Sequence, residues 1–173
     1  MAKAPLVERT TAAKSKPSAV NTTGLREGQP APDFSLPDDA GGTVRLGDLA
    51  GRKVVLYFYP KDDTPGCTTE ACDFRDAAAA WRRRGAAVLG VSIDSVASHQ
   101  QFKAKHRLTF PLLSDADKRV VQAYGVWKQK SMYGRTYMGI ERTTFLIDER
   151  GRIARIFPKV SVTGHVEAVL AAL

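Results

Sequence analysis

The stretch VVLYFYPKDDTPGCTTEAC, residues 54–72, carries the clearest structural signal in this chain and contains both of its cysteines. Its first six residues are apolar or aromatic and indicate a buried strand, and the sequence Thr-Pro-Gly then turns the chain into a helix. Thr64 can cap this helix with Pro65 at the first helical position, which places Cys67 at the third. Unpaired backbone N–H groups and the positive end of the helix dipole stabilise a thiolate there. The sequence therefore predicts a reactive thiol at a strand-to-helix junction.

The segments around this junction alternate between strands and helices. A strand at residues 53–59, a helix from about residue 64 to 84 and a strand at 86–93 form a βαβ unit, which favours a parallel pair with a right-handed crossover. Short extended pieces at 33–36 and 43–46 precede it. We expect a helix at 95–106, a strand near 110–112, a helix at 117–124, a hairpin of strands 143–148 and 152–157, and a helix at 163–173. This order predicts an α/β, thioredoxin-like fold with a central mixed β-sheet flanked by helices.

Helical spacing assigns the two thiols to different faces of the cysteine helix. Cys67, Ala71, Phe74, Ala78 and Trp81 recur at steps of three and four residues, which is typical of a face packed on a sheet. Cys72 lies five positions after Cys67 and points about 140° away, so we expect it nearer solvent. The alternative is that both cysteines are inert, buried small hydrophobic residues.

This segment resembles the peroxiredoxin signature Pro-x-x-x-Thr-x-x-Cys, present here as Pro60, Thr64 and Cys67. A second cysteine five positions later is similar to the bacterioferritin comigratory protein, or peroxiredoxin Q, group of that family. The segments APDFSL (31–36), YGVW (124–127) and GIERTTFLID (139–148) also resemble the family pattern in its order. The resemblance extends from about Gly28 to the C-terminus.

The resemblance implies a thiol peroxidase in which Cys67 is oxidised by hydrogen peroxide or an alkyl hydroperoxide. Cys72 would resolve the sulfenic acid as an intramolecular disulfide, and thioredoxin or another dithiol protein would reduce it, without a cofactor. Arg142 would contact thiolate and peroxide; its alternative is a surface cation paired with Glu141 or Asp148.

The same resemblance assigns supporting roles around the sulfur. Thr64 would offer its hydroxyl, Gly66 and Cys67 their backbone N–H groups, and Pro60 would shield the pocket from water. Glu70 either orients Arg142 or is an acid favoured by the helix dipole near the helix start.

Composition places these residues in one domain. We expect residues 26–173 to form the peroxiredoxin domain and residues 1–25, which are basic and poor in apolar side chains, to form a disordered tail. No apolar stretch is long enough to span a bilayer. The net charge of +8 is spread along the chain, which argues against nucleic acid as a partner. We expect a cytoplasmic monomer or weak homodimer, although the basic leader is compatible with organelle import.

Two other function classes fit parts of the pattern. A thioredoxin-fold disulfide exchanger or redox-sensing partner would use the same cysteines without peroxidase activity, but its expected motif is Cys-x-x-Cys, whereas four residues separate Cys67 and Cys72. A basic binding module would need a clustered charged face. His99, His106 and His165 are interpreted as solvated helix residues and Asp62 with Asp63 as a turn pair, so no metal site is expected.

Overall fold

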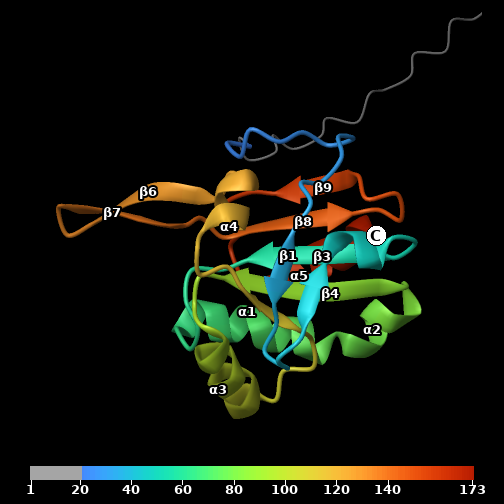
Figure 1. The fold of residues 1–173 in the computed structure, drawn as a ribbon, viewed down its shortest axis with the longest axis horizontal. Helices are drawn as coiled ribbons and strands as arrows, with labels where there is room; N and C mark the ends of the chain where they lie inside the picture. Colours follow the sequence, from blue (N-terminus) through green and yellow to red (C-terminus); the bar gives the residue numbers. More distant parts are fainter. Residues whose placement is uncertain (1–20) are drawn as a thin grey trace, which may run out of the picture.

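The computed structural model describes residues 21–173 and has a five-stranded central sheet in the order β5-β4-β3-β8-β9 (Figure 1). Strands β3 (Lys53–Phe58), β4 (Ala86–Ser92) and β5 (Leu112–Ser114) are parallel, whereas β8 (Thr143–Ile147) and β9 (Ile153–Phe157) run antiparallel to their neighbours. The sheet is therefore mixed, as predicted. Strand β3 lies in its centre with five of its six residues buried, because both of its faces are covered.

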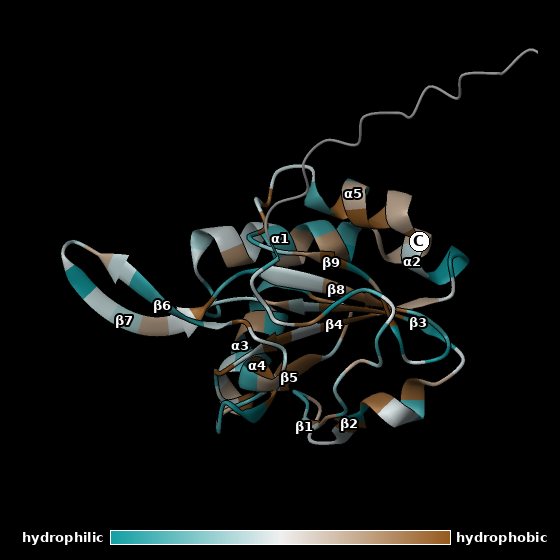
Figure 2. Cartoon of the chain, turned by 90° about the horizontal axis from the view of Figure 1, so that it is seen from above, coloured by the Kyte–Doolittle hydropathy of each residue, from teal (hydrophilic) through white to brown (hydrophobic). Residues whose placement is uncertain are grey.

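Helices cover the two faces of the sheet unequally (Figure 2). One face carries α1 (Pro65–Asp76), α2 (Ala78–Arg83) and α5 (His165–Ala172), and α3 (Val96–His106) contributes Phe102 to the same core cluster. The other face is covered by β1 (Ser35–Pro37), β2 (Thr43–Arg45), the 3-10 helix η1 (Leu46–Leu49) and α4 (Arg119–Ala123). The cysteine helix thus packs on the central strands, which confirms the predicted thioredoxin-like arrangement.

The predicted single helix from residue 64 to 84 is wrong in one respect, because it is interrupted at Ala77. The indole N–H of Trp81 donates a hydrogen bond of 3.0 Å to the carbonyl of Phe74, near the end of α1. Helical periodicity continues across the interruption, so the hydrophobic pattern alone could not reveal it. The predicted strand near residues 110–112 is also displaced, and starts at Leu112.

A hairpin that the sequence analysis did not predict projects away from the sheet (Figure 1). It consists of β6 (Trp127–Met132) and β7 (Arg135–Ile140), joined at Tyr133 and Gly134, which both have positive φ. Among the described residues, the exposed large hydrophobic side chains all belong to it: Met132, Tyr133, Tyr137 and Met138. Because little of the hairpin is buried, it lacks the alternation of apolar and polar residues that indicates a half-buried strand.

The predicted tail lies mostly outside the described residues. Residues 21–25, which the prediction assigns to that tail, contact the domain: Thr23 is buried and Leu25 packs against the core. Gly125 has φ +66°, and a Cβ atom there would lie 1.9 Å from the Thr23 carbonyl oxygen, so only glycine allows this approach. No helix in the described part of the chain has the length and apolar character to cross a membrane.

Candidate active site

Cys67 lies in the first turn of α1, at the junction with the central strand, where the sequence predicts it. Thr64 is the N-cap residue, Pro65 is the first helical residue, and Cys67 is only 1% exposed. The first backbone hydrogen bond of the helix runs from Thr68 N to Thr64 O, at 2.8 Å. The N–H groups of Gly66 and Cys67 precede this bond and belong to the donors that a helix start leaves without intrahelical partners.

Thr64 occupies the N-cap position of α1, as predicted, but its side chain makes no capping hydrogen bond. Its backbone has the extended conformation of an N-cap, but its hydroxyl donates to the Lys61 carbonyl at 2.9 Å and thereby closes the loop before the helix. The oxygen therefore keeps acceptor capacity for another partner while its proton is engaged. Pro60 is half-buried in the same loop. The contact of either residue with a bound peroxide stays a prediction.

The structure brings Arg142 and Glu70 to the sulfur. Arg142 directly precedes β8, and its guanidinium donates from Nη1 to Glu70 Oε1 at 2.7 Å and from Nη2 to Cys67 Sγ at 3.4 Å. Its carbonyl accepts from Val160 N at 2.9 Å, which fixes the backbone. A Cβ atom on Gly66 would lie 3.1 Å from Nη2, so a side chain at that position would crowd the guanidinium. The alternative, in which Arg142 is a surface cation paired with Glu141 or Asp148, does not fit, because its guanidinium is bonded to Glu70 and Cys67.

Burial and the close pairing of charges shift the pKa values of Glu70 and Arg142. The Glu70 side chain is fully buried, and burial raises its pKa to about 7, against the opposing charge and hydrogen bond of Arg142. Burial alone lowers the pKa of Arg142, but the charges of Glu70 and Cys67 outweigh it and raise that pKa. Glu70 Oε2 has no hydrogen-bond partner among the described residues. The site therefore holds a permanent cation beside the sulfur, with a carboxyl that changes charge near neutral pH.

Cys72 occupies a different environment on the same helix. It is half-buried, so it lies nearer solvent than Cys67, as the helical spacing predicts. Both cysteines are free thiols. Residues five apart in an α-helix have Cα atoms about 8.7 Å apart, whereas a disulfide requires roughly 4.4–6.8 Å. The helix therefore has the conformation of the reduced protein, and it must open before the two sulfurs can bond.

The interpretation of the histidines as solvated is wrong for His99 and His165. His99 is fully buried and lies 2.7 Å from Asp62 Oδ2, and Asp62 is itself buried instead of forming an exposed turn. His165 is also buried; burial, followed by the charge of Arg142, lowers its pKa to about 4, and its Nε2 bonds to Thr144 Oγ1 at 2.8 Å. No sequence periodicity distinguishes a buried, paired histidine from a solvated one.

Asp62, Asp94 and His99 place potential ligand atoms within 4.8 Å of one another. The imidazole and the Asp62 carboxylate bond directly to each other, and Asp94 Oδ2 accepts from the backbone N–H of Asp62 at 2.8 Å. These atoms are thus hydrogen-bonded among themselves in the described structure. The expectation that the protein holds no metal stays a prediction.

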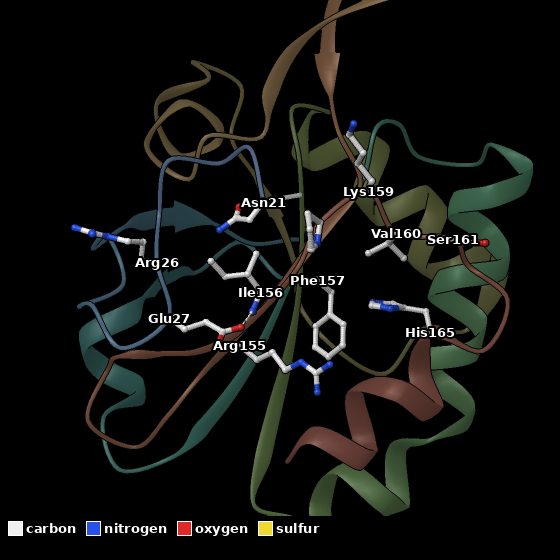
Figure 3. Close-up of a pocket in the computed structure, with 11 residues that line it drawn as sticks. Asn21, Arg26, Glu27, Arg155, Ile156, Phe157, Lys159, Val160, Ser161 and His165 are labelled. Atoms are coloured by element: carbon white, nitrogen blue, oxygen red, sulfur yellow. Dashed lines mark hydrogen bonds between the residues drawn. The ribbon is translucent and has the colours of Figure 1, made fainter. Parts of the chain in front are cut away.

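A separate shallow pocket of about 560 Å³ lies beside β9 and the start of α5 (Figure 3). Cationic side chains, an aromatic ring and the buried imidazole share this lining, with Arg26, Arg155, Phe157, Lys159 and His165 among its members. Neither cysteine nor Arg142 is among its lining residues in the described structure. The group formed by Cys67, Arg142 and Glu70 at the start of α1 therefore lies outside this pocket.

Comparison with known proteins agrees with the geometry of the cysteine site. The AhpC/TSA family model matches residues 27–156. The Bacillus subtilis protein named peroxiredoxin Bcp is 52% identical over 146 residues, which are 84% of this chain and 93% of that protein. A Coxiella burnetii relative carrying the name bcp is 57% identical over 149 residues, or 86% of this chain and 99% of the relative.

Solved structures show the same relationship. The bacterioferritin comigratory protein of Xanthomonas campestris, whose structure was determined to study its alkyl peroxide reduction activity, superposes with a TM-score of 0.77 at 47% identity. The match covers 80% of this chain and 88% of that one. A PrxQ mutant from Xylella fastidiosa gives a TM-score of 0.78 at 41% identity, covering 89% and 95%.

Proposed function

The chain belongs to the AhpC/TSA family, as a peroxiredoxin of the Bcp/PrxQ group, and from this premise we propose which residues carry out its thiol peroxidase reaction. Cys67 is the peroxidatic residue and Cys72 the resolving residue. Arg142 binds the thiolate and the peroxide, Glu70 orients Arg142, and Thr64, with the N–H groups of Gly66 and Cys67, contacts the peroxide. Pro60 limits the access of water.

The reaction proceeds in three balanced steps. The Cys67 thiolate attacks the terminal oxygen of the hydroperoxide, the O–O bond breaks, and the departing oxygen takes a proton to leave as water or alcohol. Cys72 then attacks the sulfenic sulfur, forming the disulfide and releasing water. A dithiol protein reduces the disulfide and becomes oxidised itself.

The observation that carries the proposal is the contact of Arg142 with the sulfur at 3.4 Å, with Glu70 holding the other side of the guanidinium. An ordinary thiol with a pKa of about 8.5 is only about 3% ionised at pH 7, so complete ionisation accelerates attack by at most about thirtyfold. Enzymes supply on the order of a million-fold or more. The remainder must come from positioned donors that stabilise the departing oxygen, and Arg142 stands where that charge develops.

Substrate, reductant, assembly and compartment are parts of the same proposal. The alkyl peroxide reduction activity of the Xanthomonas relative supports organic hydroperoxides as well as hydrogen peroxide as substrates. Thioredoxin is the proposed reductant, since the opening of the first turns of α1 that the disulfide requires also makes it accessible to a dithiol protein. We place the protein in the cytoplasm as a monomer or weak homodimer.

A peroxide-consumption assay with a thioredoxin system tests the proposal. The wild-type chain should consume hydrogen peroxide and an alkyl hydroperoxide, and Cys67→Ser should not. A disulfide exchanger without peroxidase activity would instead exchange disulfides with a model substrate while leaving peroxide untouched, and that result would refute the residue assignments above.

A further inference from the structure

The loop between β3 and α1 carries two adjacent carboxylates that face different surroundings. Asp62 is 7% exposed, whereas Asp63 has a left-handed backbone with φ 56° and an exposed side chain. This loop ends at the N-cap residue Thr64, three positions before Cys67. Its conformation therefore determines where the first-turn N–H groups of α1 point.

The buried Asp62 carboxylate is held by three side-chain contacts. Tyr59 donates its hydroxyl to Oδ1 at 2.6 Å, Ser98 donates to Oδ2 at 2.8 Å, and His99 Nδ1 lies 2.7 Å from Oδ2. The backbone N–H of Asp62 donates to Asp94 Oδ2 at 2.8 Å. These contacts provide the hydrogen bonds that a buried polar group needs to offset the loss of water.

The surroundings of His99 identify it as the counter-charge. Its Nε2 lies 2.9 Å from the carbonyl oxygen of Leu113, which can only accept, so Nε2 carries a proton. Its Nδ1 lies 2.7 Å from Asp62 Oδ2, so the imidazole and the carboxyl group share a hydrogen bond. Burial by itself lowers the pKa of His99, but the hydrogen bond and charge of Asp62, the Leu113 carbonyl and Asp94 outweigh it and raise that pKa.

The second carboxylate ties the loop to the same helix from outside. Asp63 pairs with Lys105 at 2.8 Å and with His106 Nε2 at 3.0 Å, both near the end of α3. Exposed pairs of this kind contribute little to stability, whereas breaking a buried pair by removing one partner costs much more. His99 and its neighbour Ser98 thus supply the buried attachment between α3 and the loop that precedes Cys67, and His99 is the member of the two that can carry charge.

We propose that His99 is a positioning residue for peroxide reduction, because its pairing with Asp62 fixes the loop that aligns the first turn of α1, and with it Cys67, under Arg142. His99 acts through this loop and does not touch the reacting atoms. The inference rests on the proposed function of Cys67. Misplacing a reacting group by about 1 Å can slow a reaction about a hundredfold, so a loosened loop has a measurable effect.

Two amide substitutions separate the contacts of the imidazole. His99→Asn places an amide nitrogen near the position of Nδ1 and can still donate to Asp62, whereas His99→Gln places one near Nε2 and can donate only to the Leu113 carbonyl. Lys103→Met is the matched control, because Lys103 lies on the same helix but pairs with Asp39, in another loop, at 2.9 Å.

The readouts are the rate of single-turnover peroxide consumption by the reduced protein and the thiolate absorbance at neutral pH, with thermal unfolding measured beside them. We expect His99→Gln to lose about tenfold or more in rate, together with thiolate content, and His99→Asn to recover most of both. Lys103→Met should unfold at a lower temperature with an unchanged rate.

Each contrary result is distinguishable. The positioning role is overturned if His99→Gln folds and has the wild-type rate. It is also overturned if His99→Asn or Lys103→Met loses as much rate as His99→Gln does. If His99→Gln does not fold, Asp62→Asn decides, because it keeps the size of the side chain but removes the carboxylate that pairs with His99. An unchanged rate and thiolate content in Asp62→Asn overturn the inference. Failure of the wild-type chain to consume peroxide would instead refute the proposed function.

Discussion

Each cysteine of α1 has an arginine and a carboxylate in its neighbourhood, but the two groups differ in their exposure to solvent. Beside Cys67, the Arg142–Glu70 pair is 2.7 Å long with side chains 16% and 0% exposed. On the opposite face near Cys72, the Arg75–Asp76 pair is 2.9 Å long with side chains 30% and 67% exposed. The same residue types are thus present twice, once inside the protein and once at its surface.

The difference between the two groups shows that burial and position on the helix, more than residue type, distinguish the two thiols. Solvent screens the charge of Arg75, whereas Arg142 acts on the sulfur in a water-poor environment where electrostatic interactions are stronger. Cys67 also has the unpaired N–H groups of the helix start, which Cys72 lacks five residues later. We therefore expect Cys67 to supply reactivity and Cys72 to need only access.

The largest effect should come from exchanging the two thiols for hydroxyls. Cys67→Ser should abolish peroxide consumption, while Cys72→Ser should keep the first turnover and then stall or over-oxidise with thioredoxin as donor. Single-turnover and steady-state peroxide assays check this. Equal loss of the first turnover in both variants would mean that the two environments do not differ in function.

The next effect concerns the two arginines. Arg142→Ala should slow Cys67 oxidation by about a hundredfold or more, which exceeds the loss of ionisation, because the guanidinium also holds the peroxide. Arg142→Lys should rescue poorly, and Arg75→Ala, the matched control on the Cys72 face, should leave the rate nearly unchanged. Oxidation is measured at neutral pH and again where the thiol is fully ionised. Full recovery of Arg142→Ala at high pH would leave this arginine with an ionisation role only.

A smaller, local effect is expected when the disulfide forms. The first turns of α1 must open, and Gly66, Thr68 and Thr69 are poor helix formers that lower the cost of opening. Amide hydrogen exchange should show at least about tenfold faster exchange between residues 67 and 73 after oxidation, with α2 unchanged. Unchanged protection in that segment would refute the intramolecular disulfide.

The smallest effect is on stability and concerns Glu70. Its pKa is raised by burial from 4.5 to about 7, so the folded state binds its proton more tightly than the unfolded state does. This contribution to stability is complete below pH 4.5 and is lost as the pH rises to about 7. Between pH 5 and 8, the free energy of unfolding of Glu70→Gln should therefore rise by roughly 2 kcal/mol relative to that of wild type.

Urea unfolding of the reduced proteins at several pH values measures this gain. Glu149→Gln, which changes an exposed carboxyl in the turn between β8 and β9, is the control, and we expect its unfolding to follow that of wild type at each pH. Parallel behaviour of Glu70→Gln would show that Arg142 keeps Glu70 ionised throughout this range.

Much of the site could be predicted from the sequence because its signals are local. The apolar strand, the Thr-Pro-Gly start and the spacing of the cysteines place Cys67 in the first turn and Cys72 on another face. The meeting of Arg142 with Glu70 joins segments 72 residues apart, and it was expected from the family resemblance. Local patterns contain no information on such a contact.

The remaining features could not be predicted for physical reasons. His99 is fully buried although its helix has a weak apolar stripe, because a partner from another loop compensates its charge. The β6–β7 hairpin buries too little of its surface to produce a hydrophobic pattern. The break at Ala77 has no proline or glycine to mark it, and depends on the indole of Trp81 reaching a carbonyl of α1.

That break limits the size of the cooperative unit that melts when the cysteines pair. In an uninterrupted helix each hydrogen bond helps its neighbour to form, so loss of one end propagates along the chain. Here the Phe74 carbonyl is occupied by the Trp81 side chain, and α2 forms its own backbone bonds from Ala77 onward, including Trp81 N to Ala77 O at 3.1 Å. The first turns of α1 can therefore unwind while Phe74 and Trp81 remain packed in the core, and each catalytic cycle rebuilds one short segment of helix without disturbing α2.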